Sequence, residues 1–197
     1  MSGKVAAILL AAGKSRRMGC CKQLLPLGGT TVIGRCLDAL VQGGASEIVV
    51  VVSPDGVEVA KAALAYPVKL VTNSSDEGDM ASSVRAGRTV VPVEASGVII
   101  ALCDYPLVQP ATVTRLLESH LAEPHRIVIP VHGGRRGHPV LLPRLVLEEL
   151  QGNLTLKDLV RRDPPRLLGI EVDDPGVLID MDTPEDYRRL RDTASLT

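Results

Sequence analysis

The feature that most limits the possible folds is a regular alternation of short, predominantly apolar runs with segments of helical periodicity. The apolar runs are rich in β-branched residues and predict strands at Val5–Ala11, Glu47–Ser53, Val68–Thr72, Gly97–Leu102 and Ile127–Val131. Helices are predicted between them at Thr31–Gln42, Gly56–Tyr66, Met80–Val90 and Ala111–Leu121. Strands without a polar face are typical of a parallel sheet that is covered on both faces. Because parallel strands need right-handed helical crossovers, we predict a doubly wound α/β fold with a mostly parallel, Rossmann-like sheet.

The C-terminal third is expected to be irregular. A glycine-rich hairpin tip over residues 133–137 is predicted to join Ile127–Val131 to a short strand at Val140–Leu142. Helical segments are expected at Arg144–Gln151, Thr155–Arg161 and Pro184–Asp192, and strand-like segments at Arg166–Glu171 and Val177–Ile179. No internal repeat or linker interrupts the chain. Since 197 residues suit one domain, we expect a single domain over 1–197.

Composition excludes two classes of partner. The 22 Lys and Arg residues are balanced by 23 Asp and Glu, and the aromatic residues are three Tyr, with no Phe or Trp. Nucleic-acid binding is not expected, because it needs a basic surface and often aromatic stacking platforms. A membrane span is not expected either, since the longest apolar runs fall far short of ~20 residues. The four Cys residues form no Cys-x-x-Cys pair and no secretory signal is recognised, so a cytoplasmic location is expected.

The loop after the first strand has the composition of a polyphosphate-binding loop. It follows a strand at the sheet edge where open α/β folds bind ligands, and Gly13 and Gly19 allow backbone N–H groups to approach an anion. Four cations crowd this loop with no acid among them: Lys14, Arg16, Arg17 and Lys22. A Walker A loop is excluded because Met18 stands where its second glycine is required, and the dinucleotide pattern Gly-x-Gly-x-x-Gly is absent.

The same loop resembles a known family. Leu10-Ala11-Ala12-Gly13-x-Ser15-x-Arg17-Met18-Gly19-x-x-Lys22 is similar to the signature of the molybdenum-cofactor guanylyl- and cytidylyltransferases. The resemblance implies a nucleotidyltransferase fold and catalytic roles for Arg17 and Lys22. It also implies that the nucleotide is bound by Leu10, Ala11, Ala12, Gly13, Ser15, Met18 and Gly19. Leu-Ala-Ala-Gly, in place of Leu-Ala-Gly-Gly, resembles the cytidine branch and implies CTP.

Two carboxylates are candidate Mg²⁺ ligands. Asp104 follows the fourth predicted strand, at the same sheet edge as the first loop, and Mg²⁺ is held by one or two carboxylates together with substrate phosphates. On its own such an Asp is more often a cap for a turn or helix. Asp182 opens the string Asp-Thr-Pro-Glu-Asp, whose plain interpretation is helix capping. Similar strings in the related transferases imply a second metal carboxylate at Asp182.

Two further segments resemble the family's substrate sites. Asn73, Ser82 and Ser83 belong to a stretch that resembles the nucleotide-binding loop, although its residues also suit a loop that caps the next helix. Arg136, Gly137, His138 and Pro139 resemble the cytidylyltransferase branch near its second substrate, although a lone His is more often structural. Residues 152–157 depart from that branch, which has Gly-Asp-x-Gly-Ala-Arg there.

The resemblance implies that the phosphate of a molybdopterin carrying molybdenum attacks the α-phosphorus of CTP and releases pyrophosphate, assisted by Mg²⁺. A molybdenum hydroxylase is the implied client. Within the enzyme class, a molybdenum-cofactor guanylyltransferase or a sugar-phosphate nucleotidylyltransferase stays open. From other classes, an NAD(P)H-dependent reductase and a non-catalytic maturation chaperone on the same scaffold also stay open.

Overall fold

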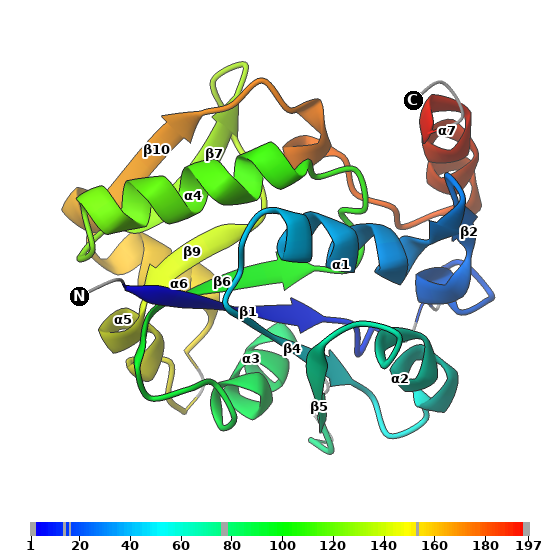
Figure 1. Cartoon of the computed structure of the whole chain (residues 1–197), viewed down its shortest axis with the longest axis horizontal. Helices are drawn as coiled ribbons and strands as arrows, with labels where there is room; N and C mark the ends of the chain where they lie inside the picture. Colours follow the sequence, from blue (N-terminus) through cyan, green and yellow to red (C-terminus); the bar gives the residue numbers. More distant parts are fainter. Residues whose placement is uncertain (1–2, 14, 16, 76–78, 153, 195–197) are drawn as a thin grey trace.

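A mixed sheet forms the centre of the molecule (Figure 1). The structure, a computed structural model, describes residues 3–13, 15, 17–75, 79–152 and 154–194. The strand order is β10-β7-β9-β6-β1-β4-β5, with β8 paired to β7. Their bounds are Lys4–Leu10 (β1), Glu47–Val52 (β4), Val68–Thr72 (β5), Ala95–Leu102 (β6), Ile127–His132 (β7), Arg135–Arg136 (β8), Val140–Pro143 (β9) and Leu167–Glu171 (β10). Three pairings in this sheet are antiparallel: β9 with β6, β9 with β7, and β8 with β7. The other pairings in this sheet are parallel.

Helices cover both faces of the sheet, which confirms the predicted doubly wound α/β architecture. One face is packed by α1 (Val32–Gln42) and α4 (Pro110–Ala122), and the other by α3 (Met80–Arg88), α5 (Arg144–Glu148) and α6 (Leu156–Arg162). In β1, Val5, Ala7 and Leu9 face the first layer, while Ala6 and Ile8 face the second. Successive strand residues point to opposite faces. An unbroken apolar run is therefore what a strand buried on both sides requires.

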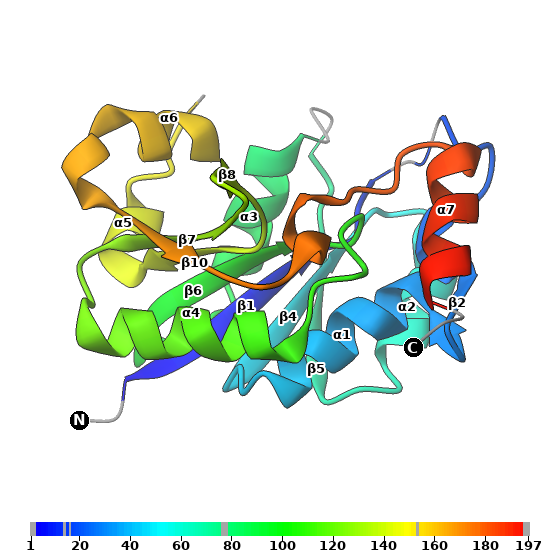
Figure 2. The same cartoon turned by 90° about the horizontal axis from the view of Figure 1, so that it is seen from above.

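The remaining elements lie around this frame. α2 (Val57–Ala63) follows β4, and η2 (Pro164–Arg166) precedes β10. α7 (Pro184–Ala194) lies beside the small β2–β3 ribbon, whose strands are Pro26–Leu27 and Thr30–Thr31 (Figure 2). The Tyr187 hydroxyl donates a hydrogen bond to the Pro26 carbonyl, at 2.8 Å, and ties α7 to that ribbon. None of the helices in the described ranges is both long and apolar enough to cross a membrane.

Three local details differ from the sequence-based expectations. The β2–β3 ribbon and the short helix η1 (Lys22–Leu24) lie in a segment where neither was predicted. The predicted strand at Val177–Ile179 is wrong, because η3 (Pro175–Leu178) occupies that segment. Its turn is set by Pro175 and by the buried Asp174, whose carboxylate accepts hydrogen bonds from the Gly176 N–H and the Thr112 hydroxyl. α5 is also shorter than predicted and ends at Glu148.

Candidate functional site

The carboxyl ends of β1 and β6 bring the first loop and Asp104 to one edge of the sheet. Leu10 and Leu102 are register partners in these two strands, and the Cys103 N–H donates to the Leu10 carbonyl at 3.1 Å. A third segment joins them, because the Met181 N–H donates to the Asp104 carbonyl at 2.9 Å. Residues far apart in the sequence therefore meet at the strand ends, where open α/β folds place their ligands.

The Lys22 side chain connects the segments that meet here. Its Nζ donates hydrogen bonds to the Met181 carbonyl at 2.8 Å and to Asp182 Oδ1 at 3.0 Å, and lies 3.5 Å from Asp104 Oδ2. The Lys22 side chain is only 11% exposed. Arg17 approaches Asp182 from the solvent side, with Nη1 2.8 Å from Oδ2. The structure thus brings together the four residues predicted as catalytic or metal-binding.

Gln23 holds the first loop in shape, a role that the sequence analysis missed. Its buried amide nitrogen donates to the Ala11 carbonyl at 3.0 Å and to the Gly13 carbonyl at 2.8 Å. Its amide oxygen accepts from the Ser15 hydroxyl at 3.2 Å. Ser15 has a φ of 47°, in the left-handed region that non-glycine residues rarely adopt. A buried amide bonded to main-chain oxygens is thus what fixes the backbone of the predicted phosphate loop.

A cavity of about 180 Å³ opens beside this loop. Six of the predicted site residues line it: Leu10, Ala12, Gly13, Lys22, Ser83 and Asp104. Ala11, by contrast, is buried in the core, and Met18 is buried as well. The predicted cations Lys14 and Arg16 lie outside the described residues.

The segment before α3 combines both interpretations that the sequence left open. Asp79 caps the helix, since its carboxylate accepts from the Ser82 N–H at 2.7 Å. This hydrogen bond from the Ser82 backbone lowers the pKa of Asp79. Asn73 Nδ2 donates to the hydroxyls of Ser82 and Ser83 at 3.0 and 2.9 Å, and all three residues are buried. Asn73 therefore braces the helix start, and Ser83 alone of these three lines the cavity.

Arg136, Gly137 and His138 line a different, mostly apolar pocket of about 350 Å³. Pro139 does not line it and contributes instead to a small cavity beside α1 and α4. Gly137 packs against the Val177 carbonyl so closely that no side chain would fit. The His138 ring contacts the Tyr105 ring with centroids 4.8 Å apart. Burial lowers the pKa of His138, against the opposing charge of Asp104. Burial, followed by nearby aspartates, raises the pKa of Tyr105 to about 12.

Among the side chains near the strand ends, the Asp104 carboxylate could bind a divalent cation. Its Oδ1 atom is buried and has no hydrogen-bond partner among the described residues, so one carboxylate oxygen is left for a ligand. Asp182 differs, because both of its oxygens accept hydrogen bonds from cations, Arg17 and Lys22. Within the described ranges, no group of three or more His, Cys, Asp or Glu side chains could hold a metal ion. Substrate oxygens would have to supply further ligands, as is usual for Mg²⁺.

Comparisons with known proteins identify a family, although the relatives' names describe different activities. The family model described as the MobA-like NTP transferase domain matches residues 7–166. Nicotine blue oxidoreductase from Paenarthrobacter nicotinovorans is 30% identical over 94% of this chain and 96% of its own length. The 2-C-methyl-D-erythritol 4-phosphate cytidylyltransferase of Rhodococcus jostii is 30% identical over 89% of this chain and 81% of its own length.

Solved structures share the whole fold. The crystal structure of Rv0371c from Mycobacterium tuberculosis H37Rv has a TM-score of 0.81 at 32% identity, covering 98% of this chain and 100% of that one. A complex of the same protein with manganese has a TM-score of 0.78 at 29% identity, with coverage of 98% and 100%. The manganese of that complex shows that a relative of this fold accepts a divalent metal.

The family match spans the first loop, Asp104 and the segment from 136 to 139, while Asp182 lies beyond its end. It confirms the resemblance that was identified from the first loop, and with it the predicted class of enzyme. The chain belongs to the MobA-like NTP transferase domain family and is a nucleotidyltransferase.

Proposed function

We propose that the chain, as one domain over 1–197, is a CTP:molybdopterin cytidylyltransferase. An oxygen of the acceptor phosphate attacks the α-phosphorus of CTP, the bond between the α- and β-phosphates breaks, and pyrophosphate leaves. The observation that carries this proposal is the buried Lys22 ammonium between Asp104, which follows β6, and Asp182, which precedes α7, beside the cavity of about 180 Å³. A fixed cation at the wall of a small cavity suits a reaction in which negative charge moves onto a leaving group.

The chain's residues mainly orient the substrates and neutralise charge in this reaction. The acceptor needs no strong base, because the second pKa of a phosphate monoester is about 6 and it is largely ionised at pH 7. Lys22 is held in place by three oxygen atoms, so it needs little rearrangement to stabilise the α-phosphoryl group and the departing pyrophosphate. Arg17 is 75% exposed and can reach the outer phosphates.

The proposed cofactor is Mg²⁺, held by Asp104 and supported by Asp182. Its positive charge would offset the negative charge of the substrate phosphates. The unpartnered Oδ1 atom of Asp104 supports this assignment. Asp182 would act in two ways, as an ion-pair partner of Lys22 and Arg17 and as the second acidic group near the metal.

Ala12 supports the choice of cytidine. Its methyl group lines the cavity together with Gly13, where it would take space from a purine. A difference of this size is worth about 1–3 kcal/mol in a pocket, which is enough for a preference and too little for exclusive selection. A molybdenum hydroxylase remains the proposed client for the product.

A second candidate function is supported by one relative. The nicotine blue oxidoreductase from Paenarthrobacter nicotinovorans is similar over nearly its whole length, so an NAD(P)H-dependent reductase is the alternative. The cations Arg17 and Lys22 would then bind the cofactor's phosphates, and Asp104 would need no metal.

The two functions are separated by their products. Purified protein is incubated with molybdenum-loaded molybdopterin and Mg²⁺, with CTP, GTP or NADPH in turn, while pyrophosphate release and NADPH oxidation are followed. We expect pyrophosphate release, faster with CTP than with GTP. It should be lost in Asp104→Asn and kept in the control Glu58→Gln, whose carboxylate lies exposed on α2 and pairs with Lys61. NADPH oxidation without pyrophosphate release would overturn the proposal in favour of the reductase.

A further inference from the structure

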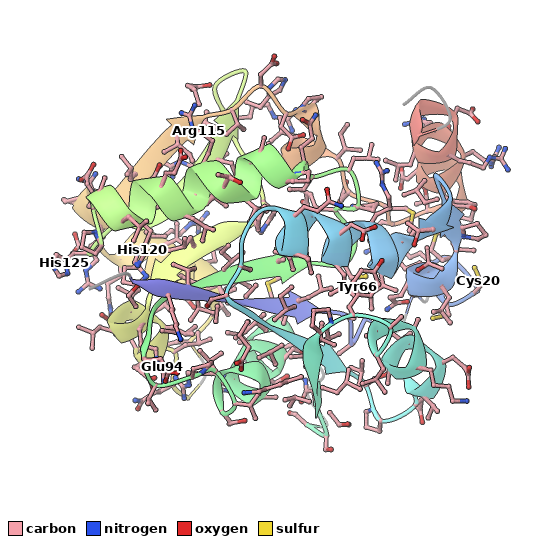
Figure 3. The ribbon with its side chains drawn as sticks, in the orientation of Figure 1. Cys20, Tyr66, Glu94, Arg115, His120 and His125 are labelled. Carbon is pink, nitrogen blue, oxygen red and sulfur yellow. The ribbon has the colours of Figure 1, made fainter. Side chains whose placement is uncertain are left out.

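A cavity of about 460 Å³, called the distal cavity below, lies at the amino ends of the parallel strands. Ser96 lines it near the start of β6, whereas Asp104 follows the end of the same strand. At about 3.3 Å per residue, the eight residues of β6 separate these two places by roughly 25 Å. His125 also lines the distal cavity and lies at the opposite end of the molecule from Cys20 of the first loop (Figure 3). A small ligand in this cavity therefore cannot touch the groups around Lys22.

One part of the distal cavity wall is apolar and open to solvent. Leu145 of α5 is 76% exposed, whereas its neighbour Val146 is buried and packs into the core. Pro124 and Pro143 line the cavity as well. The volume falls in the range of about 300–1,000 Å³ that is typical of small-molecule sites. Leu145 is therefore available to the apolar body of a ligand and is not needed by the core.

Arg144 of α5 brings a guanidinium group to the same cavity in a fixed orientation. Its Nε donates to Glu148 Oε1 at 2.9 Å, and its Nη1 donates to the Pro92 carbonyl at 2.6 Å. These two bonds hold the planar group at two of its three nitrogens. Within the described ranges, its Nη2 atom forms neither a hydrogen bond nor an ion pair.

Arg166 of η2 is arranged in the same manner on another wall of the distal cavity. Its Nη1 donates to Glu149 Oε1 at 2.7 Å, and its Nε lies 3.1 Å from Asp163 Oδ2. Its Nη2 atom has no partner among the residues that the structure describes. The distal cavity is thus lined by two oriented guanidinium groups, each with one nitrogen left to donate to an anion.

The charges that line the distal cavity favour a ligand with a single negative charge. Glu149 is the one acidic side chain among the described residues of its lining, and it is already paired with Arg166. With His125 counted as neutral, the two guanidinium groups and this carboxylate leave one positive charge unbalanced. A carboxylate ligand carries the matching charge and has two oxygens, one for each free Nη2 atom. A phosphate dianion would bring more negative charge than the lining can balance.

We propose that the distal cavity binds a small organic monocarboxylate with an apolar body, as a ligand that takes no part in nucleotidyl transfer. The carboxylate accepts hydrogen bonds from the Nη2 atoms of Arg144 and Arg166, and the apolar body packs against Leu145. Because the protein already orients both guanidinium groups, binding costs little further side-chain entropy. This site is independent of the chemistry proposed for Lys22 and Asp104.

Calorimetry with the full chain and three probes tests the chemistry of the ligand. 2-Naphthoate has one carboxylate on an apolar body, and we expect it to bind with a Kd of about 1 mM or tighter. Neutral 2-naphthamide has the same shape and should bind at least about tenfold more weakly, because it loses the charge-assisted hydrogen bonds. 2-Naphthyl phosphate should also bind more weakly than 2-naphthoate, since it carries the excess negative charge.

Matched substitutions test the place of binding. Leu145→Asp sets a negative charge at the cavity and should weaken binding of 2-naphthoate at least about tenfold. The control Leu64→Asp makes the same change at a residue that is 62% exposed after α2, and should leave the affinity unchanged. Arg166→Lys keeps a cation for Glu149 but removes the planar fork, and should weaken binding by about tenfold.

Several results would overturn this assignment. Equal affinity for 2-naphthoate and 2-naphthamide refutes the role of the two guanidinium groups, and tighter binding of 2-naphthyl phosphate refutes the preference for one charge. Displacement of 2-naphthoate by CTP with Mg²⁺ places the probe in the cavity beside Lys22. Weaker binding in Lys157→Glu, with no change in Leu145→Asp, places it in the pocket of about 350 Å³ instead. If Arg166→Lys does not fold, Leu145→Asp decides alone, and an unchanged affinity in that variant refutes the site.

Discussion

Replacing Lys22 by Met tests whether one ammonium group both joins the site together and serves the reaction. The substitution keeps the apolar part of the side chain and removes the charge. The hydrogen bond from the buried ammonium to the Met181 carbonyl is worth about 1.5–3 kcal/mol, because charged donors form the stronger bonds. The ion pairs add less. Asp104 and Asp182 are 29% and 39% exposed, and pairs that water reaches contribute about 0.2–1 kcal/mol.

We therefore expect Lys22→Met to lower the free energy of unfolding by about 2–5 kcal/mol. For a chain of this length, that corresponds to a fall in Tm of roughly 4–20 °C. Turnover should fall by about 10²–10³, the effect of removing one preorganised donor from a transition state. Urea denaturation followed by circular dichroism measures the first quantity. Pyrophosphate release, assayed well below the Tm of the variant, measures the second.

The control is Lys61→Met, which removes an exposed ammonium that pairs with Glu58 on α2 and should change neither quantity appreciably. If Lys22→Met loses less than about 1 kcal/mol of stability, the ammonium does not join the three segments as the contacts indicate. If it is destabilised as expected but loses less than tenfold in turnover, Lys22 is a structural residue and its catalytic role is refuted.

Three further substitutions test other parts of the structure. Ala12→Gly should move the CTP:GTP ratio of kcat/KM towards GTP, by up to about tenfold, because it removes a methyl group from the cavity wall; an unchanged ratio would exclude Ala12 from base selection. Gln23→Leu should raise the KM for the nucleotide and expose the first loop to limited proteolysis, since two carbonyls lose their donor; proteolysis at the wild-type rate would contradict the bracing role. His120 is fully buried, and this burial lowers its pKa. It lies in the half of the molecule away from Cys20 of the first loop (Figure 3). Because the unfolded chain then binds the proton more readily, stability should decline as pH falls below about 6.5, and a Tm profile from pH 8 to 5 should be flatter for His120→Leu than for the wild type.

Most of the fold could be predicted because its strands are buried on both faces. In β1, alternate residues enter opposite layers of the core, so the sequence shows one continuous apolar run of limited length. The prediction fails at Val177–Ile179, where three apolar residues resemble a strand. The conformation there depends on Asp174 and its hydrogen bond to Thr112, which is 62 residues away and has no signature in the local sequence.

In the candidate site, too, some features could be predicted from the sequence and others could not. Asp104 and the first loop could be predicted together because parallel strands end at a common edge. The contacts of Gln23 could not, since they are made with backbone carbonyls that carry no sequence pattern. Nor could the sequence indicate that Asp182 has both oxygens occupied by Arg17 and Lys22. The string around Asp182 specifies a helix start, while its partners are set by how that helix packs.

The contact between Lys22 and Asp182 has a consequence for the order of events during synthesis. The two residues are 160 positions apart, and every strand of the central sheet precedes Asp182 in the chain. On the ribosome, the sheet can therefore pair completely while the Lys22 ammonium still lacks one of its two carboxylate partners and the Met181 carbonyl. The charge arrangement at the proposed nucleotide site is completed only when the segment before α7 emerges, so formation of the site reports that the last part of the fold is in place.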